Sequence, residues 1–151
     1  MTVVQLVQKI IEPYPESAAL KTHIYAPESP LMCLCLDARG FLFGPLLAQR
    51  LGVGFVMVRK KGKLPGATVS VAYNLEYGKA EAEIQVDAVT PGQKVVLLDD
   101  LLATGGTLFA ACELMKKQHA EIQGCMVVIE LTELKGSDRL KPYSVFSLVQ
   151  Y

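Results

Sequence analysis

The stretch that decides the fold runs from Lys94 to Lys117 and reads KVVLLDDLLATGGTLFAACELMKK. Its first apolar run, Val95 to Leu98, shows no alternation, which is typical of a strand buried on both faces of a parallel sheet. Two acids follow, Asp99 and Asp100, and then a turn over residues 101–103. In the second half of the stretch, apolar residues recur at helical spacing. The stretch therefore predicts a strand, an acidic edge, a glycine-containing loop and a helix.

The loop between this strand and this helix reads Thr104-Gly105-Gly106-Thr107. Adjacent glycines let the backbone approach a ligand closely, and the N–H groups and dipole of the following helix favour an anion. The acid pair lies where open α/β sheets place their ligands. The plain alternative is an ordinary strand-to-helix turn with N-capping threonines. We interpret the whole unit as a site for a phosphorylated sugar.

Length and composition favour one globular domain. The chain has 151 residues, of which 51% are hydrophobic and 20% charged, and its formal net charge is zero. These values argue against a nucleic-acid surface, and the sequence shows neither an apolar run of membrane-spanning length nor a signal-peptide layout. The four cysteines form no C-x-x-C pair, so we expect small, buried, reduced thiols and a cytoplasmic protein.

The remaining pattern alternates strands with helices and predicts a parallel α/β sheet. We expect a helix over Phe43–Leu51, with Leu46, Leu47 and Leu51 facing inward and Gly52 as its C-cap. A β-ribbon with a flexible tip is predicted from Thr68–Tyr73 and Ala80–Val86, an expected place for an active-site lid. The other predicted elements are strands over Leu31–Leu36, Gly54–Val58, Gly124–Leu131 and Ser144–Val149, and a short helical segment over Leu134–Leu140.

Cationic residues follow two of these predicted strands. Arg39 comes directly after the first strand, and the run Arg59-Lys60-Lys61-Gly62-Lys63 ends the second. If the sheet is parallel, both lie at the same edge as the acid pair, where they would bind a polyanion. The alternative is that both are ordinary solvated surface charges.

Several long motifs together resemble the type I phosphoribosyltransferases and, within them, the adenine-specific branch. In chain order they read ARGFLFGPLLAQ, VRKKGKLPG, YNLEYGKAEAEIQ, VDAVTPGQKVVLLDDLLATGGT, ELTELKG and SLVQY. The resemblance implies an α/β fold in which a parallel-sheet core carries flanking helices and a flexible β-ribbon lid. It is tightest over residues 37–151, and it implies a single domain over 1–151 whose core is residues 31–151. Residues 1–30 are a divergent segment without the family's Phe-Arg-Asp motif, so its hood over the base is expected to be reduced or absent.

The resemblance also assigns roles to residues at these positions. Ribose hydroxyls would bind Asp99 and Asp100, and the pyrophosphate would bind Asp37, Ala38 and Arg39, with added positive charge from Arg59, Lys60 and Lys63. The 5′-phosphate would bind Ala103, Thr104, Gly105, Gly106 and Thr107. Glu76 would be the catalytic acid that handles a proton of the base, and Tyr77 would close over the site.

The implied reaction transfers ribose 5-phosphate from phosphoribosyl diphosphate to adenine, giving AMP and pyrophosphate in purine salvage. Mg²⁺ is the implied cofactor. It would be held mainly through the substrate, with no direct protein ligand and with Asp99 and Asp100 reaching it through water. The implied assembly is a homodimer that binds neither nucleic acid nor membrane. Two alternatives stay open: a catalytically impaired variant that binds phosphoribosyl ligands without turnover, and a nucleotide-binding regulator on the same fold.

Overall fold

The computed structural model describes residues 31–75 and 78–151. These residues form a seven-stranded sheet in the order β3-β4-β2-β1-β5-β6-β7. The pairs among β2, β1, β5, β6 and β7 are parallel, whereas β4 runs antiparallel to both β2 and β3. The strands are β1 Leu31–Leu36, β2 Gly54–Lys60, β3 Thr68–Leu75, β4 Gly78–Gln85, β5 Lys94–Leu102, β6 Glu121–Glu130 and β7 Val145–Gln150. The predicted α/β class is confirmed, with the β-ribbon making the sheet mixed rather than purely parallel.

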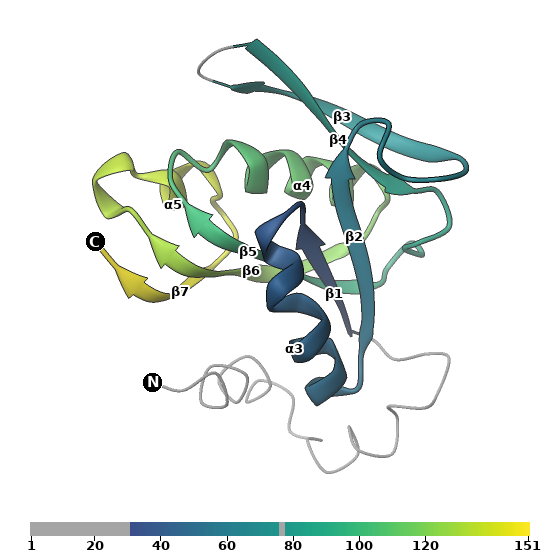
Figure 1. The fold of residues 1–151 in the computed structure, drawn as a ribbon, viewed down its shortest axis with the longest axis horizontal. Coiled ribbons are helices and arrows are strands. Elements are labelled where there is room, and N and C mark those ends of the chain that lie inside the picture. Colours follow the sequence, from purple (N-terminus) through teal and green to yellow (C-terminus); the bar gives the residue numbers. More distant parts are fainter. Residues whose placement is uncertain (1–30, 76–77) are drawn as a thin grey trace.

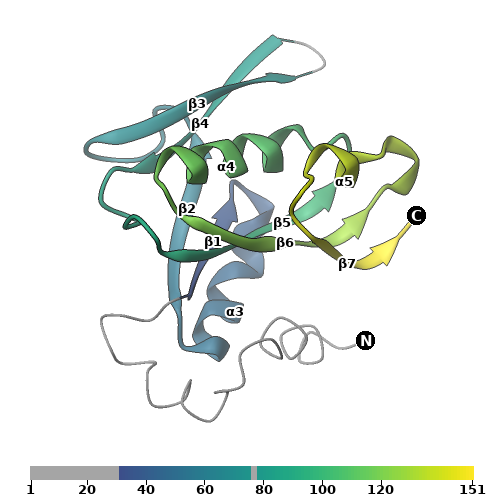
Figure 2. The same ribbon diagram turned by 180° about the vertical axis from the view of Figure 1, so that it is seen from behind.

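Helices cover both faces of the sheet, as Figures 1 and 2 show from opposite sides. On one face α3 packs over β1 and β2, and on the other lies α4, which also packs against the β3–β4 ribbon at one end of the sheet. The helical elements are α3 Gly44–Leu51, α4 Gly106–Lys117 and α5 Gly136–Arg139, with 3-10 turns η1 Arg39–Leu42 and η2 Thr132–Leu134. In the part of the chain that the structure describes, no helix is long and apolar enough to cross a membrane. The expected change in the hood falls in residues 1–30 and lies outside the described residues.

Strand β5 is longer than its sequence pattern suggested. The turn expected over residues 101–103 is wrong for its first two positions, because Leu101 and Leu102 pair with Ile129 and Glu130 of β6. The acid pair therefore lies within a hydrogen-bonded strand rather than after one. This pairing fixes the backbone of both acids to the sheet.

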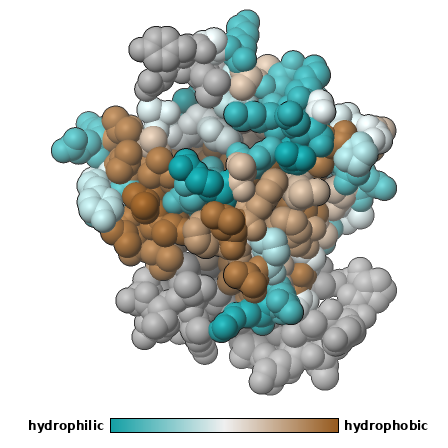
Figure 3. All heavy atoms as spheres, in the orientation of Figure 1, coloured by the Kyte–Doolittle hydropathy of each residue, from teal (hydrophilic) through white to brown (hydrophobic). Residues whose placement is uncertain are grey.

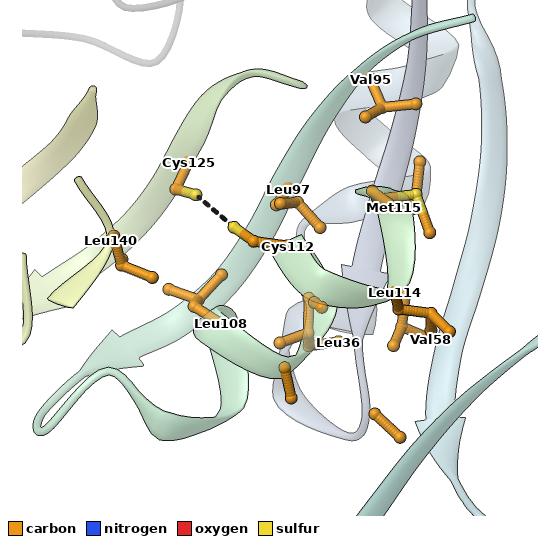
Figure 4. Packing of buried hydrophobic residues seen from close by; sticks show 14 of the residues in the cluster. Leu36, Val58, Val95, Leu97, Leu108, Cys112, Leu114, Met115, Cys125 and Leu140 are labelled. Atoms are coloured by element: carbon orange, nitrogen blue, oxygen red, sulfur yellow. Dashed lines mark hydrogen bonds between the residues drawn. The ribbon is translucent and has the colours of Figure 1, made fainter. Parts of the chain in front are cut away.

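Helix α4 begins at Gly106, so half of the Thr-Gly-Gly-Thr loop belongs to its first turn. Its N-cap is Gly105, in the left-handed region at φ 78°, and no side chain caps the helix. Figure 4 shows how its apolar side, with Leu108 and Cys112 among others, faces the sheet. The Cys112 and Cys125 sulfurs are 3.9 Å apart, and all four cysteines are buried and unbridged, as expected.

The expected inward position of Leu46 is wrong, because its side chain is 63% exposed. The short helix α3 buries only a narrow stripe through Leu47, Ala48 and Leu51. Since adjacent residues of an α-helix are turned by about 100°, Leu46 falls outside this stripe. Gly52 is the C-cap in the left-handed region, as predicted.

Candidate functional site

A cavity of about 320 Å³ opens at the carboxyl ends of β1 and β5. Most of the residues assigned to ligand binding from the sequence line it, although they come from separate parts of the chain. They are Asp37, Ala38, Arg39, Lys60, Asp99, Asp100, Ala103, Thr104, Gly105, Gly106 and Thr107. Parallel strands end at the same edge of a sheet, which is why turns more than fifty residues apart meet here.

The acid pair forms the centre of the cavity. The Asp99 Oδ1 atom accepts a hydrogen bond of 2.9 Å from the backbone N–H of Asp100, and Asp100 Oδ2 lies 2.8 Å from Arg39 Nε. Burial raises the pKa of Asp99 to about 7, and the neighbouring Asp100 carboxyl also favours the protonated form. The Asp100 carboxylate is thus paired with a cation, whereas the Asp99 carboxyl has a pKa near neutral pH.

The turn after β1 is held by β2. The Asp37 N–H donates to the Val58 carbonyl at 2.9 Å, and Arg59 Nε donates to Asp37 Oδ2 at 3.0 Å. Arg59 also donates to the Lys63 carbonyl at 3.2 Å. The sequence pointed to Arg59 as a residue that binds the negative charge of a ligand, but its guanidinium holds the turn in place. Arg59 and Lys60 also line a small hollow next to the cavity. Lys63 lines neither hollow.

A buried acid that the sequence analysis did not single out organises the cationic segment. Glu83 is only 2% exposed, and its carboxylate accepts hydrogen bonds from the N–H groups of Lys63 and Leu64, each 2.9 Å long, and from Thr68 Oγ1 at 3.1 Å. Burial raises the pKa of Glu83, but hydrogen bonds from this segment and from Thr68 outweigh burial and leave the pKa below its usual value of 4.5. The only signal in the sequence was an acid within a β-prone run.

Four further lining residues were also missed: Tyr73, Leu101, Leu102 and Leu108. Tyr73 comes from β3, so the ribbon contributes to the cavity wall, and the sequence carried no signal for this because it depends on how the ribbon packs. The expected catalytic Glu76 and the covering Tyr77 lie outside the described residues.

The cavity offers hard oxygen donors for a metal. Within residues 31–75 and 78–151, no group of three or more His, Cys, Asp or Glu side chains could hold an ion. The Asp99 and Asp100 carboxylates remain as donors, and this set fits Mg²⁺, which is commonly bound by one or two carboxylates together with substrate phosphates.

Both the sequence and the structure are similar to those of known proteins. The phosphoribosyl transferase domain model matches residues 8–151. The mouse adenine phosphoribosyltransferase is 66% identical over 116 residues, which are 77% of this chain and 64% of the mouse protein. The chain thus spans less than two thirds of the length of that relative.

Solved structures extend the similarity over nearly the whole chain. The Rhodothermus marinus adenine phosphoribosyltransferase is 37% identical with a TM-score of 0.81, covering 99% of this chain and 79% of that protein. The Saccharomyces cerevisiae enzyme, solved with a dideoxy-imino-altritol bisphosphate and adenine, is 42% identical with a TM-score of 0.77, covering 96% and 80%. The cavity joins an acid pair to a glycine-rich helix N-terminus, and this agrees with the match to the domain model and with the similar solved structures. The chain belongs to the phosphoribosyltransferase family, in the group of the adenine phosphoribosyltransferases.

Proposed function

We propose that the protein transfers ribose 5-phosphate from phosphoribosyl diphosphate to adenine and releases AMP and pyrophosphate. The observation that carries the proposal is the single cavity that brings the acid pair, the Gly105–Thr107 turn and Arg39 together. The three features suit a sugar diol, a monophosphate and a diphosphate, respectively. The yeast relative, solved with adenine and a bisphosphate, supports the choice of ligands.

The substrate would lie across the cavity. Its 5′-phosphate would accept hydrogen bonds from the backbone of Ala103–Thr107 at the N-terminus of α4. The ribose hydroxyls would donate to the carboxylates of Asp99 and Asp100. The pyrophosphate would lie against the turn of Asp37, Ala38 and Arg39, with positive charge from Lys60. In this arrangement Arg59 and Lys63 act indirectly, by shaping the turn and the cationic segment.

The reaction places negative charge on the leaving group. The bond between C1 and the pyrophosphate oxygen breaks with its electron pair on oxygen, and the N9 lone pair of adenine forms the new bond to C1. Mg²⁺ bound with the substrate would neutralise part of the leaving-group charge. Arg39 and Lys60 would stabilise the same charge more strongly in the transition state than in the ground state. Glu76 would take up the proton that N9 loses, and Tyr77 would cover the site.

The direct test is AMP formation by the full chain from adenine and phosphoribosyl diphosphate with Mg²⁺, followed by chromatography. Asp100→Asn should reduce kcat/KM by 10-fold or more, as removal of a transition-state interaction commonly does (about 10²-fold or more for one oxyanion donor). The matched control is Asp87→Asn, an exposed aspartate in the turn before β5. Guanine, hypoxanthine and uracil, offered in place of adenine, test the choice of base.

Two outcomes would overturn the proposal in different ways. Binding of phosphoribosyl diphosphate without turnover of any base would identify the catalytically impaired variant. Binding of AMP alone, without the diphosphate substrate, would favour the nucleotide-binding regulator.

The assembly proposed with this activity is a homodimer. Hydrophobic side chains gather on the face that carries α3, as Figure 3 shows, and Leu42, Phe43 and Leu46 are exposed there. A second copy that covered them would remove an apolar surface from water. Light scattering should give twice the chain mass, and Leu46→Glu should shift it toward the monomer, whereas Leu134→Glu, at another exposed leucine, should not. The single domain and the cytoplasmic location remain predictions of the sequence.

A further inference from the structure

The phosphate loop rests on a second glycine from a distant part of the chain. A Cβ atom added at Gly136, the first residue of α5, would overlap the carbonyl oxygen of Ala103 and lie 3.0 Å from the N atom of Gly105. In the reverse direction, a Cβ added at Gly105 would lie 2.7 Å from the Gly136 carbonyl oxygen. The two backbones therefore touch without room for a side chain, directly behind the proposed phosphate site.

The start of α5 is held at this place by strand pairing. The Leu131 N–H donates to the Leu102 carbonyl at 2.9 Å, so the chain that leaves β6 stays attached to the end of β5. Beyond α5, the buried Leu140 belongs to the same apolar cluster as Leu108 of α4, and both are drawn in Figure 4. Gly136 is thus fixed from both sides.

A buried carboxylate fixes the end of β6, just before this segment. Glu130 is 6% exposed and accepts hydrogen bonds from Ser147 Oγ at 2.8 Å and Gln150 Nε2 at 3.0 Å. Burial raises the pKa of Glu130, yet these hydrogen bonds more than offset it, so the group is ionised at neutral pH. Hydrogen bonds to an ionised acceptor are among the stronger ones in proteins, and here they tie β7 to the end of β6, from which the chain continues to α5.

We propose that Gly136 is a positioning residue, whose absent side chain lets α5 support the Ala103–Gly105 backbone in the geometry that binds the 5′-phosphate, with Glu130 as its anchor. The proposal rests on the proposed function, since it assigns the phosphate to this loop. An added methyl group would push the loop toward the cavity. A misplacement on the order of 1 Å in a ligand-positioning group costs up to about 100-fold in activity, so the effect is large enough to measure.

The test compares Gly136→Ala with Asp138→Ala, an exposed position on the same short helix, in the full chain. Titration calorimetry with ribose 5-phosphate should give at least roughly tenfold weaker binding for Gly136→Ala and less than about a twofold change for the control. In steady-state assays, the KM for phosphoribosyl diphosphate should rise while the KM for adenine stays unchanged. A loss of stability alone would not raise one KM and leave the other unchanged.

The outcomes separate this proposal from the proposed function. If the unmodified protein binds neither ribose 5-phosphate nor phosphoribosyl diphosphate, the proposed function fails and takes the role of Gly136 with it. If it binds them and Gly136→Ala binds them equally well, only the positioning role is overturned. Should Gly136→Ala not fold, Glu130→Gln decides: weaker ribose 5-phosphate binding supports the anchor, and unchanged binding overturns it.

Discussion

The Nε atom of Arg59 lies 3.0 Å from Oδ2 of Asp37, and this contact joins the ends of the neighbouring parallel strands β1 and β2. Both side chains are largely screened from solvent. Of the positive charges that the sequence places at this edge, Arg59 is thus already matched within the protein. Its contribution to ligand binding is expected to pass through the shape of the Asp37 turn.

A double-mutant cycle of Arg59→Met and Asp37→Asn should therefore give a coupling energy of about 1 kcal/mol in the free energy of unfolding, because a partly buried pair is less screened than an exposed one. Urea denaturation measures it. The exposed pair of Lys116 and Glu113 provides the reference cycle, for which about 0.3 kcal/mol is expected. Equal coupling in the two cycles would contradict a structural role for the Arg59 contact.

The affinity for ribose 5-phosphate should increase with pH through the titration of Asp99. The pKa of this carboxyl is raised to about 7, so it is protonated below that pH, and only the ionised form accepts hydrogen bonds from both ribose hydroxyls through its two oxygens. Between pH 8 and pH 6 the ionised fraction falls from roughly nine tenths to one tenth, which predicts about tenfold weaker binding.

Calorimetric titrations across this range give the profile. Because the ligand phosphate titrates in the same range, Asp99→Asn supplies the baseline, and about a tenfold change should remain once the profile of this variant is subtracted. A variant with the same pH profile as the unmodified protein would assign the effect to the ligand alone.

Replacing Glu83 by glutamine should loosen the cationic segment. The change is expected to lower the free energy of unfolding at pH 7 by about 1–3 kcal/mol, because one carboxylate oxygen that accepts buried donors becomes an amide that donates. The pKa of Glu83 is lowered in the folded protein, so its stabilisation is present above pH 4.5 and is lost as the pH falls further. Denaturation between pH 6 and pH 3.5 should show a shallower decline for Glu83→Gln than for the control Glu133→Gln, which changes an exposed acid.

Truncation of a leucine should lower the free energy of unfolding far more on the buried face of α4 than on the exposed side of α3. Leu108→Ala should cost about 3 kcal/mol of unfolding free energy, since Leu108 is fully buried in the cluster of Figure 4. Leu46→Ala should change it by no more than about 0.5 kcal/mol in the monomer. Similar losses at both positions, at a concentration where light scattering gives the monomer mass, would contradict the exposed position of Leu46.

Local patterns in the sequence are enough to predict the secondary structure of the site. The uninterrupted apolar run before Asp99, the glycines after it and the helical spacing that follows are local patterns, so strand, loop and helix could be placed within a few residues. The side of α3 that faces inward could not, because the stripe that a short helix buries depends on how the helix packs against β1 and β2. Leu46 was misplaced for that reason.

The residues that support the site become visible only in the folded chain. Glu83, Glu130 and Gly136 are ordinary residues in the sequence, and their roles arise from partners 15 to 33 positions away: the carboxylates accept hydrogen bonds from other elements, and Gly136 touches the Ala103 backbone. Whether an acid is solvated or buried, and whether a glycine is free or pressed against a loop, depends on which chain segments fold onto it. The residues proposed to bind the ligand could therefore be read from the sequence, whereas the residues that hold them in place could not.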